Sequence, residues 1–149
     1  MPASAPLLAQ TIQLVVAPAF LLVGIGNLLG VFAGRLARVL DRSRALAMRH
    51  GETVGVEHQR IVEELRVLDR RMDVVNHSIF AGVASGVIVC LLVACMFIQQ
   101  VAGFSLSAVI SVAFVVAMLL LMTSLALFLI EVRLAVRVIH VPTELLERD

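Results

Sequence analysis

The sequence offers few residues that could carry out catalysis or bind a metal. Its histidines are scattered, at His50, His58, His77 and His140, with no HExxH motif and no metal-ligand spacing. Glu57, next to His58, is the best acid–base candidate, but on a helix the pair is typical of a solvated face. There is no GxSxG, no P-loop and no GxGxxG after a strand. We therefore expect no catalytic residue, no metal site, no cofactor and no enzymatic activity.

A second set of polar residues lies inside apolar segments. Asn27 is the most polar residue well within one such segment, and Thr123 and Ser124 lie deep in another. A buried Asn usually bonds a neighbouring helix, and the alternative is that these residues line a water-filled path. No charged residue lies deep in an apolar segment, which argues against a proton-coupled transporter.

The composition shows what must surround these residues. The chain has 149 residues, of which 60% are hydrophobic and 15% charged, whereas soluble domains carry about 45–50% apolar and about 25% charged residues. A chain of this size cannot bury that much apolar surface within itself, so membrane lipid must cover the rest. We expect one compact integral membrane unit.

Every charged residue falls in residues 35–73 or 131–149. A transmembrane helix needs about 20 apolar residues, and the charge-free segments provide three. The sequence predicts an all-α protein with three transmembrane helices and a helical hairpin between the first and second. The boundaries we assign are 1–34 for the outer N-terminus and first helix, 35–73 for the hairpin, 74–98 for the second helix, 99–105 for a short outer turn, 106–130 for the third helix and 131–149 for a C-terminal tail.

The basic residues give the orientation. Arginines flank the apolar segments only on the side of the hairpin and the tail, so the positive-inside rule places both in the cytoplasm and the N-terminus outside. The expected location is a bacterial cytoplasmic membrane. The first segment lacks the basic start of a cleaved signal peptide. Residues 7–17, before Pro18, either lie at the outer interface or extend a kinked first helix.

The hairpin sequence is charged on its outer faces and apolar on one stripe. In its second half, apolar residues follow a heptad spacing into the second span, at Ile61, Leu65, Leu68, Met72, Val75 and Ile79. The first half is less regular, and the two arms join near residues 51–55. One interpretation is that this apolar stripe only packs the two arms of the hairpin against each other. The alternative is that it also packs against the hairpin of another subunit. Acidic and basic residues are interleaved in the hairpin without aromatic residues, which disfavours nucleic-acid binding. Within one arm, Glu63 could pair with Arg66 or Arg70, and Glu57 with Arg60.

Glycines recur at helical spacing inside the apolar segments. Gly26, Gly30 and Gly34 form one stripe, and Gly82 and Gly86 form another. In lipid, small residues allow helices to approach closely, so we predict helix packing at both stripes. The spacing does not decide between packing within one chain and packing between chains.

Several segments resemble a family known as domain of unknown function 2721. They are PAFLLVGIG at residues 18–26, RLARVLDR at 35–42, EL at 64–65 with LDRR at 68–71, and FLIEV at 128–132. The resemblance covers nearly the whole chain. It implies a small bacterial membrane protein, and it implies no established activity.

The RLARVLDR segment places a charge cluster at the inner membrane boundary, where the third span ends. Its members are Arg35, Arg38, Asp41, Arg42 and Glu131. We hypothesise that Arg35 or Arg38 pairs with Glu131 and so ties the first span to the third. The alternative is that the arginines face anionic lipid head groups.

Two functions fit these features. The first is a homo-oligomer whose subunits surround a pore or cavity, which the heptad stripe, the glycines and the small size of the chain favour. The second is a membrane scaffold or regulator whose charged hairpin docks a protein partner.

Overall fold

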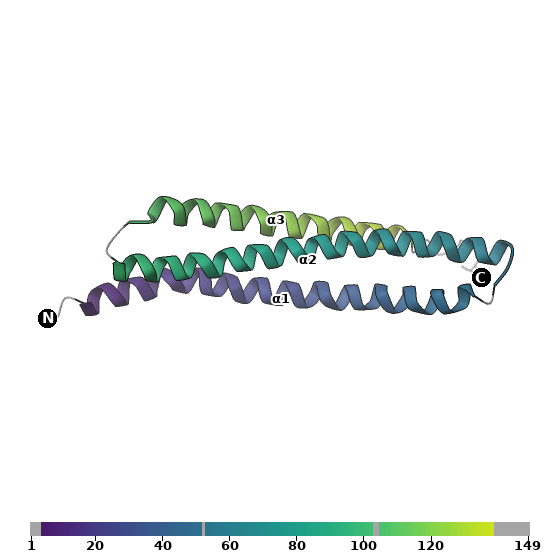
Figure 1. The fold of residues 1–149 in the computed structure, drawn as a ribbon, viewed down its shortest axis with the longest axis horizontal. Helices are drawn as coiled ribbons and strands as arrows, with labels where there is room; N and C mark the ends of the chain where they lie inside the picture. The colour runs from purple at the N-terminus through teal and green to yellow at the C-terminus, as the bar shows by residue number, and fades with distance from the viewer. Residues whose placement is uncertain (1–3, 52, 103–104, 139–149) are drawn as a thin grey trace, which may run out of the picture.

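The computed structural model describes residues 4–51, 53–102 and 105–138, and this part of the chain contains three long helices and no strand. They are α1 (Ser4–His50), α2 (Val56–Ala102) and α3 (Ser107–Val138), and they lie side by side in an elongated bundle (Figure 1). Each contains a stretch long and apolar enough to cross a membrane. The predicted all-α architecture is confirmed, and the spans indicate a multi-pass membrane protein.

The helices run further than the predicted boundaries. α1 continues unbroken through Pro18, so residues 7–17 belong to a helix from Ser4 onward. α2 extends to Ala102, into the predicted outer turn, and the side chain of Gln99 accepts a hydrogen bond from the backbone N–H of Leu106 at 3.2 Å. α3 continues past Glu131 to Val138, so the first part of the predicted tail is helical. Residues 139–149 lie outside the described part of the chain.

Neither of the first two helices breaks where the apolar segment meets the charged one. α1 and α2 therefore form a hairpin whose arms are direct continuations of the membrane segments. The connection spans residues 51–55, as the sequence predicts. Gly55 adopts a φ of 74°, a left-handed conformation that favours glycine, and its carbonyl accepts a hydrogen bond from the N–H of Gln59 at 3.3 Å.

A seven-residue repeat joins α1 to α2. On α1 the buried residues are Pro18, Ile25, Phe32, Val39 and Leu46. The buried residues of α1 therefore recur every seven residues, although the apolar residues of its hairpin half are less regularly spaced in the sequence. On α2 the matching repeat is Ile61, Leu68, Val75, Gly82 and Val89. Seven-residue spacing is the signature of coiled-coil packing, and here it runs from the membrane segments into the hairpin.

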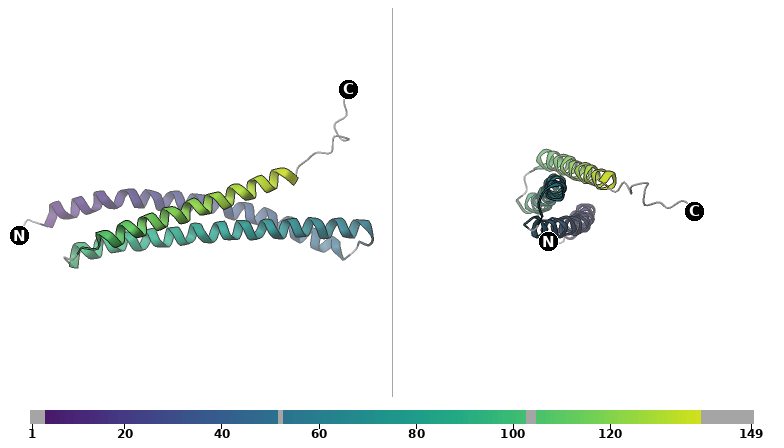
Figure 2. Two further views of the ribbon diagram at one scale, coloured as in Figure 1. Left: turned by 90° about the horizontal axis from the view of Figure 1, so that it is seen from above. Right: turned by 90° about the vertical axis from the view of Figure 1, so that its right-hand side faces the viewer.

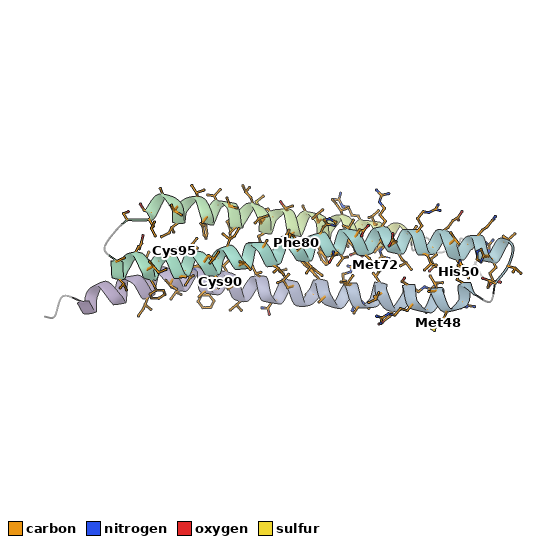
Figure 3. All side chains as sticks on the ribbon, viewed as in Figure 1. Met48, His50, Met72, Phe80, Cys90 and Cys95 are labelled. Atoms are coloured by element: carbon orange, nitrogen blue, oxygen red, sulfur yellow. The ribbon has the colours of Figure 1, made fainter. Side chains whose placement is uncertain are left out.

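α2 is the central helix of the bundle. It packs against both α1 and α3, which flank it on different sides (Figure 2). Its contact with α3 uses a second buried repeat, Ser78, Ser85 and Leu92. Elsewhere many large apolar side chains stay exposed, and Phe80 of α2 is an example (Figure 3). In a membrane, lipid covers such side chains.

Candidate functional site

Glu131 is the centre of the candidate site. It is a fully buried acid that directly follows the apolar stretch of α3. Arg71 of α2 donates a hydrogen bond from Nη2 to its Oε1 at 2.7 Å. Arg35 of α1 places Nε 3.3 Å from its Oε2. These three residues, one from each helix, are called the junction below.

The heptads explain why the junction forms. Ser78 and Ser124 face each other between α2 and α3, and each hydroxyl donates to the other's backbone carbonyl, at 2.6 and 2.7 Å. One heptad from this layer towards the hairpin, the facing residues are Arg71 and Glu131. One heptad in the other direction, the hydroxyl of Ser85 donates to the carbonyl of Ala117 at 2.8 Å. The antiparallel register of α2 and α3 therefore sets Arg71 opposite Glu131.

Two aromatic rings join α1 to α3 next to the junction. Phe32 and Phe128 stack with ring centroids 4.3 Å apart. The guanidinium of Arg35 lies 5.6 Å from the centroid of Phe128, close enough for a cation–π contact. The ring stack and the pairing with Glu131 together hold Arg35 in place.

The junction has more positive than negative charge. Two guanidinium groups share a single carboxylate, so the three side chains carry a net charge of +1. Buried Nε of Arg71 and buried Oε2 of Glu131 have no hydrogen-bond partner among the described residues. The side chains of Arg35 and Arg71 are 27% and 16% exposed. Unpaired charge in such partly buried surroundings attracts a counter-ion, because screening by water is reduced there.

The structure brings together only part of the predicted charge cluster. Arg35 lies against Glu131, which is one of the two pairings in the hypothesis. Arg38 and Asp41 are exposed and make no ion pair within the described residues. Arg42 pairs with Glu64 across the hairpin arms at 2.8 Å.

Arg71 is the functional residue that the sequence analysis missed at this site. Arg71 lies seven residues before Ser78, on the face of α2 that contacts α3. That position identifies it only once the residues of α2 that face α3 are known. The predicted pairs within one arm are also absent from the described residues, because Glu64 rather than Glu63 faces the opposite arm.

The two glycine stripes have different surroundings. A Cβ on Gly82 would lie 3.0 Å from Leu29 Cδ2 and 3.1 Å from Ser124 Oγ, so this stripe is a close three-helix contact. A Cβ on Gly86 would lie 3.6 Å from Ile25 Cγ2, at ordinary van der Waals distance.

By contrast, a Cβ on Gly26, Gly30 or Gly34 would meet no atom within 4 Å. Among the residues that the structure describes, only the α2 stripe therefore makes close contact with another helix.

The residues of the predicted polar path do not come together in one chain. Ser124 is buried in the bond with Ser78, and Thr123 donates to Leu119 of its own helix at 2.8 Å. Asn27 is exposed on α1. The hydroxyls of Ser85 and Ser124 thus bond backbone carbonyls of the neighbouring helix, whereas that of Thr123 bonds its own.

The histidine and acid candidates form no recognisable site. The ring centroids of His50 and His58 lie 4.2 Å apart, and His50 lies near the closed end of the hairpin (Figure 3). His77 contacts the carbonyl of Asp73 through Nδ1 at 2.7 Å, and His140 lies outside the described residues. Among the residues that the structure describes, no three His, Cys, Asp or Glu side chains gather as a metal site would require.

Comparison with known proteins gives a family but no activity. Residues 15–141 match the family model described as a protein of unknown function, DUF2721. The chain belongs to this family. The match includes Arg35, Arg71 and Glu131, so the junction lies within the part of the chain that defines the family. No curated protein and no solved structure matches the chain significantly.

Proposed function

We propose that the protein is a non-enzymatic, multi-pass protein of the bacterial cytoplasmic membrane that assembles with further copies of itself. In this proposal the N-terminus lies outside, and the hairpin and the C-terminal end of α3 lie in the cytoplasm. The one-sided distribution of arginine supports this orientation.

The observation that carries the proposal is the open glycine stripe of α1. A methyl group added at Gly26, Gly30 or Gly34 would have no neighbouring atom within 4 Å, whereas Gly82 is closely covered. In lipid, a stripe of small residues gains most from a helix that packs directly on it. Beside the stripe lies an apolar groove of about 390 Å³, with Gly26 and Gly86 in its lining.

The open face of α1 has the spacing of a second coiled-coil contact. Positions alternate four and three residues apart along it, through Val23, Asn27, Gly30, Gly34, Ala37, Asp41, Arg44 and Met48. All but Gly34 are exposed, and Gly34 is half-buried. Such alternation is the pattern that pairs helices in coiled coils, and none of the described helices of the same chain covers it.

The chemistry of this face suits a second copy of α1. In a parallel pair of α1 helices, Asp41 of one copy comes close to Arg38 or Arg44 of the other, and opposite charges attract. The same pairing gives Asn27 a neighbouring helix to bond, the usual arrangement for a buried Asn. Any cavity at the centre of a ring of copies would be lined by this face, so Asn27 is the residue to test for conduction.

A second function is supported by the tip of the hairpin. Met48, Val54 and Val56 are apolar, yet 73%, 90% and 70% exposed there, beyond the reach of membrane lipid. Exposed apolar residues at the end of a charged hairpin fit a scaffold or regulator that docks a cytoplasmic protein.

Native mass spectrometry of the detergent-extracted protein tests the proposal through its subunit number. We expect several copies for the natural chain and fewer for Gly30→Leu, because the leucine side chain begins in open space on the contact surface. Ala126→Leu, on an exposed position of α3, serves as the control and should keep the subunit number.

A monomeric natural chain would contradict self-assembly and shift attention to the hairpin tip. If a ring is found, ion flux in liposomes for the natural chain and for Asn27→Leu measures conduction directly.

A further inference from the structure

The junction combines unpaired positive charge with a position at the boundary between the apolar and charged parts of all three helices. Arg35 directly follows the first apolar segment, Arg71 lies three residues before Val74, where the second begins, and Glu131 directly follows the third. All three therefore lie at the depth where lipid head groups meet the protein. We propose that the junction and the groove beside it bind the phosphate of an anionic phospholipid.

The groove gives such a head group room. It has a volume of about 560 Å³, and Arg71 lines it together with Arg42 and Arg60. It runs from the junction along the hairpin between α1 and α2, with Val67 and Leu68 also in its lining. Arg42 and Arg60 extend the positive lining of this groove from Arg71 towards the hairpin tip.

The charges of the groove and the junction favour an anion. Four arginines (Arg35, Arg42, Arg60 and Arg71) lie with three glutamates (Glu63, Glu64 and Glu131), so the net charge is +1. Glu131 is fully buried and already shared by two arginines, and Glu64 is paired with Arg42. One phosphodiester carries the single negative charge that neutralises the set.

Phosphate fits the arrangement better than a point-like anion does. Guanidinium groups present their donors in a planar fork that matches two phosphate oxygens. Arg71 donates only one hydrogen bond within the described residues, and Arg35 donates none, so the partly exposed edges of both groups have donors to offer. Basic pockets between transmembrane helices on the cytoplasmic side are known to hold lipid head groups.

The test is lipid retention by the full-length protein in detergent, measured by native mass spectrometry. The protein is titrated with phosphatidylglycerol, with phosphatidylcholine of the same acyl chains, and with inorganic phosphate. We expect phosphatidylglycerol to be retained in preference to phosphatidylcholine. Arg35→Gln and Arg71→Gln should each lower that retention about tenfold.

Each variant has a matched control at the same depth. Arg38→Gln and Arg70→Gln remove exposed arginines that lie outside the junction, so both should retain the lipid as the natural chain does. Equal losses in Arg70→Gln and Arg71→Gln would show general attraction to basic surface and overturn the proposal.

Glu131→Gln separates binding from folding. It removes the competing carboxylate charge but keeps an oxygen acceptor for Arg71, so retention should be at least that of the natural chain. A loss as large as that of Arg71→Gln would mean that the junction is purely structural. Equal retention of both lipids, or inorganic phosphate displacing phosphatidylglycerol at equal concentration, would overturn the assignment to a lipid. Because the site lies away from the open face of α1, these results do not depend on self-assembly.

Discussion

The two faces of α2 hold their neighbours by different means. Towards α3, the contact is made by small hydroxyl side chains that bond backbone carbonyls across the interface, and it ends in the ion pair of Arg71 and Glu131. Towards α1, the contact is an apolar heptad that includes Ile25, Val39 and Leu46, and the hydrogen bond from Arg42 to Glu64 joins exposed side chains outside that heptad.

The two contacts therefore have different roles: the one with α3 fixes the register of the helices, and the one with α1 holds them together. A hydrogen bond from a hydroxyl to one particular carbonyl is satisfied in one alignment only, so the serines fix how α2 and α3 slide along each other. Apolar heptads tolerate small shifts more easily. On α1, the residues that do fix alignment are Arg35 in the junction and Phe32 beside it. We therefore expect the junction to matter most to stability and the hairpin surface least.

The largest expected effect is at Glu131. Glu131→Ala leaves two partly buried arginines without a counter-charge, and we expect the free energy of unfolding to fall by about 3 kcal/mol, the lower end for a broken buried pair because Arg35 is partly exposed. Titration with sodium dodecyl sulfate, followed by far-UV circular dichroism, measures this. Asp69→Ala is the control, since Asp69 is exposed and belongs neither to the junction nor to the open face of α1. Similar stability in the two variants would show that the junction adds no stability.

A smaller effect is expected at the contact among all three helices. Gly82→Ala places a methyl group 3.0 Å from Leu29 Cδ2 and 3.1 Å from Ser124 Oγ. The leucine end can move, but the hydroxyl is held in its bond, so we expect a loss of about 2 kcal/mol. Gly24→Ala, where a methyl group meets no described atom within 4 Å and which lies outside the open face of α1, should leave the unfolding free energy unchanged in the same titration. If both glycines tolerate alanine equally, the close approach of the helices at Gly82 is wrong.

The serine layer should have a still smaller effect. Removing both hydroxyls in Ser78→Ala with Ser124→Ala deletes two interhelical bonds of about 0.6 kcal/mol each, so we expect a loss of about 1 kcal/mol. Thr123→Ala deletes a hydroxyl that bonds its own helix and should cost less than about 0.5 kcal/mol. The same unfolding titration compares them. A threonine variant as destabilised as the serine pair would remove the distinction between the two kinds of hydroxyl.

The smallest effect is expected at the ion pair between the hairpin arms. Arg42 and Glu64 are 57% and 40% exposed, so water screens their attraction. A double-mutant cycle with Arg42→Ala and Glu64→Ala should give a coupling energy of about 0.5 kcal/mol or less. A coupling as large as the effect of Glu131→Ala would mean that the hairpin, rather than the junction, holds the arms together.

The fold was largely predictable because charge and hydropathy are segregated along the chain. Segments without charge predict spans, and the spacing from Ile61 to Ile79 predicts the α2 heptad. The α1 heptad was hidden, since in a span nearly every residue is apolar and no polar residue marks the outer face. For that reason the sequence alone does not show that Ile25 is buried while Val23 is exposed.

The candidate site was only partly predictable. The position of Glu131 at the end of a span showed that it needs a partner, and Arg35 was one of the two partners considered. Arg71 could not be chosen among the many arginines without the register of α2 and α3. For the same reason, spacing alone could not show that Gly82 is covered and Gly30 is open, since both stripes have four-residue spacing.

The unbroken course of α2 has a mechanical consequence. From Ser78 to Val56 the helix rises about 33 Å, at 1.5 Å per residue, with no break along the way. It can therefore act as a lever: a tilt of about 5° at the serine layer moves the hairpin tip sideways by about 3 Å. Small changes of helix angle at the serine layer are thus amplified into displacements of Val54 and Val56, the exposed apolar residues at the hairpin tip.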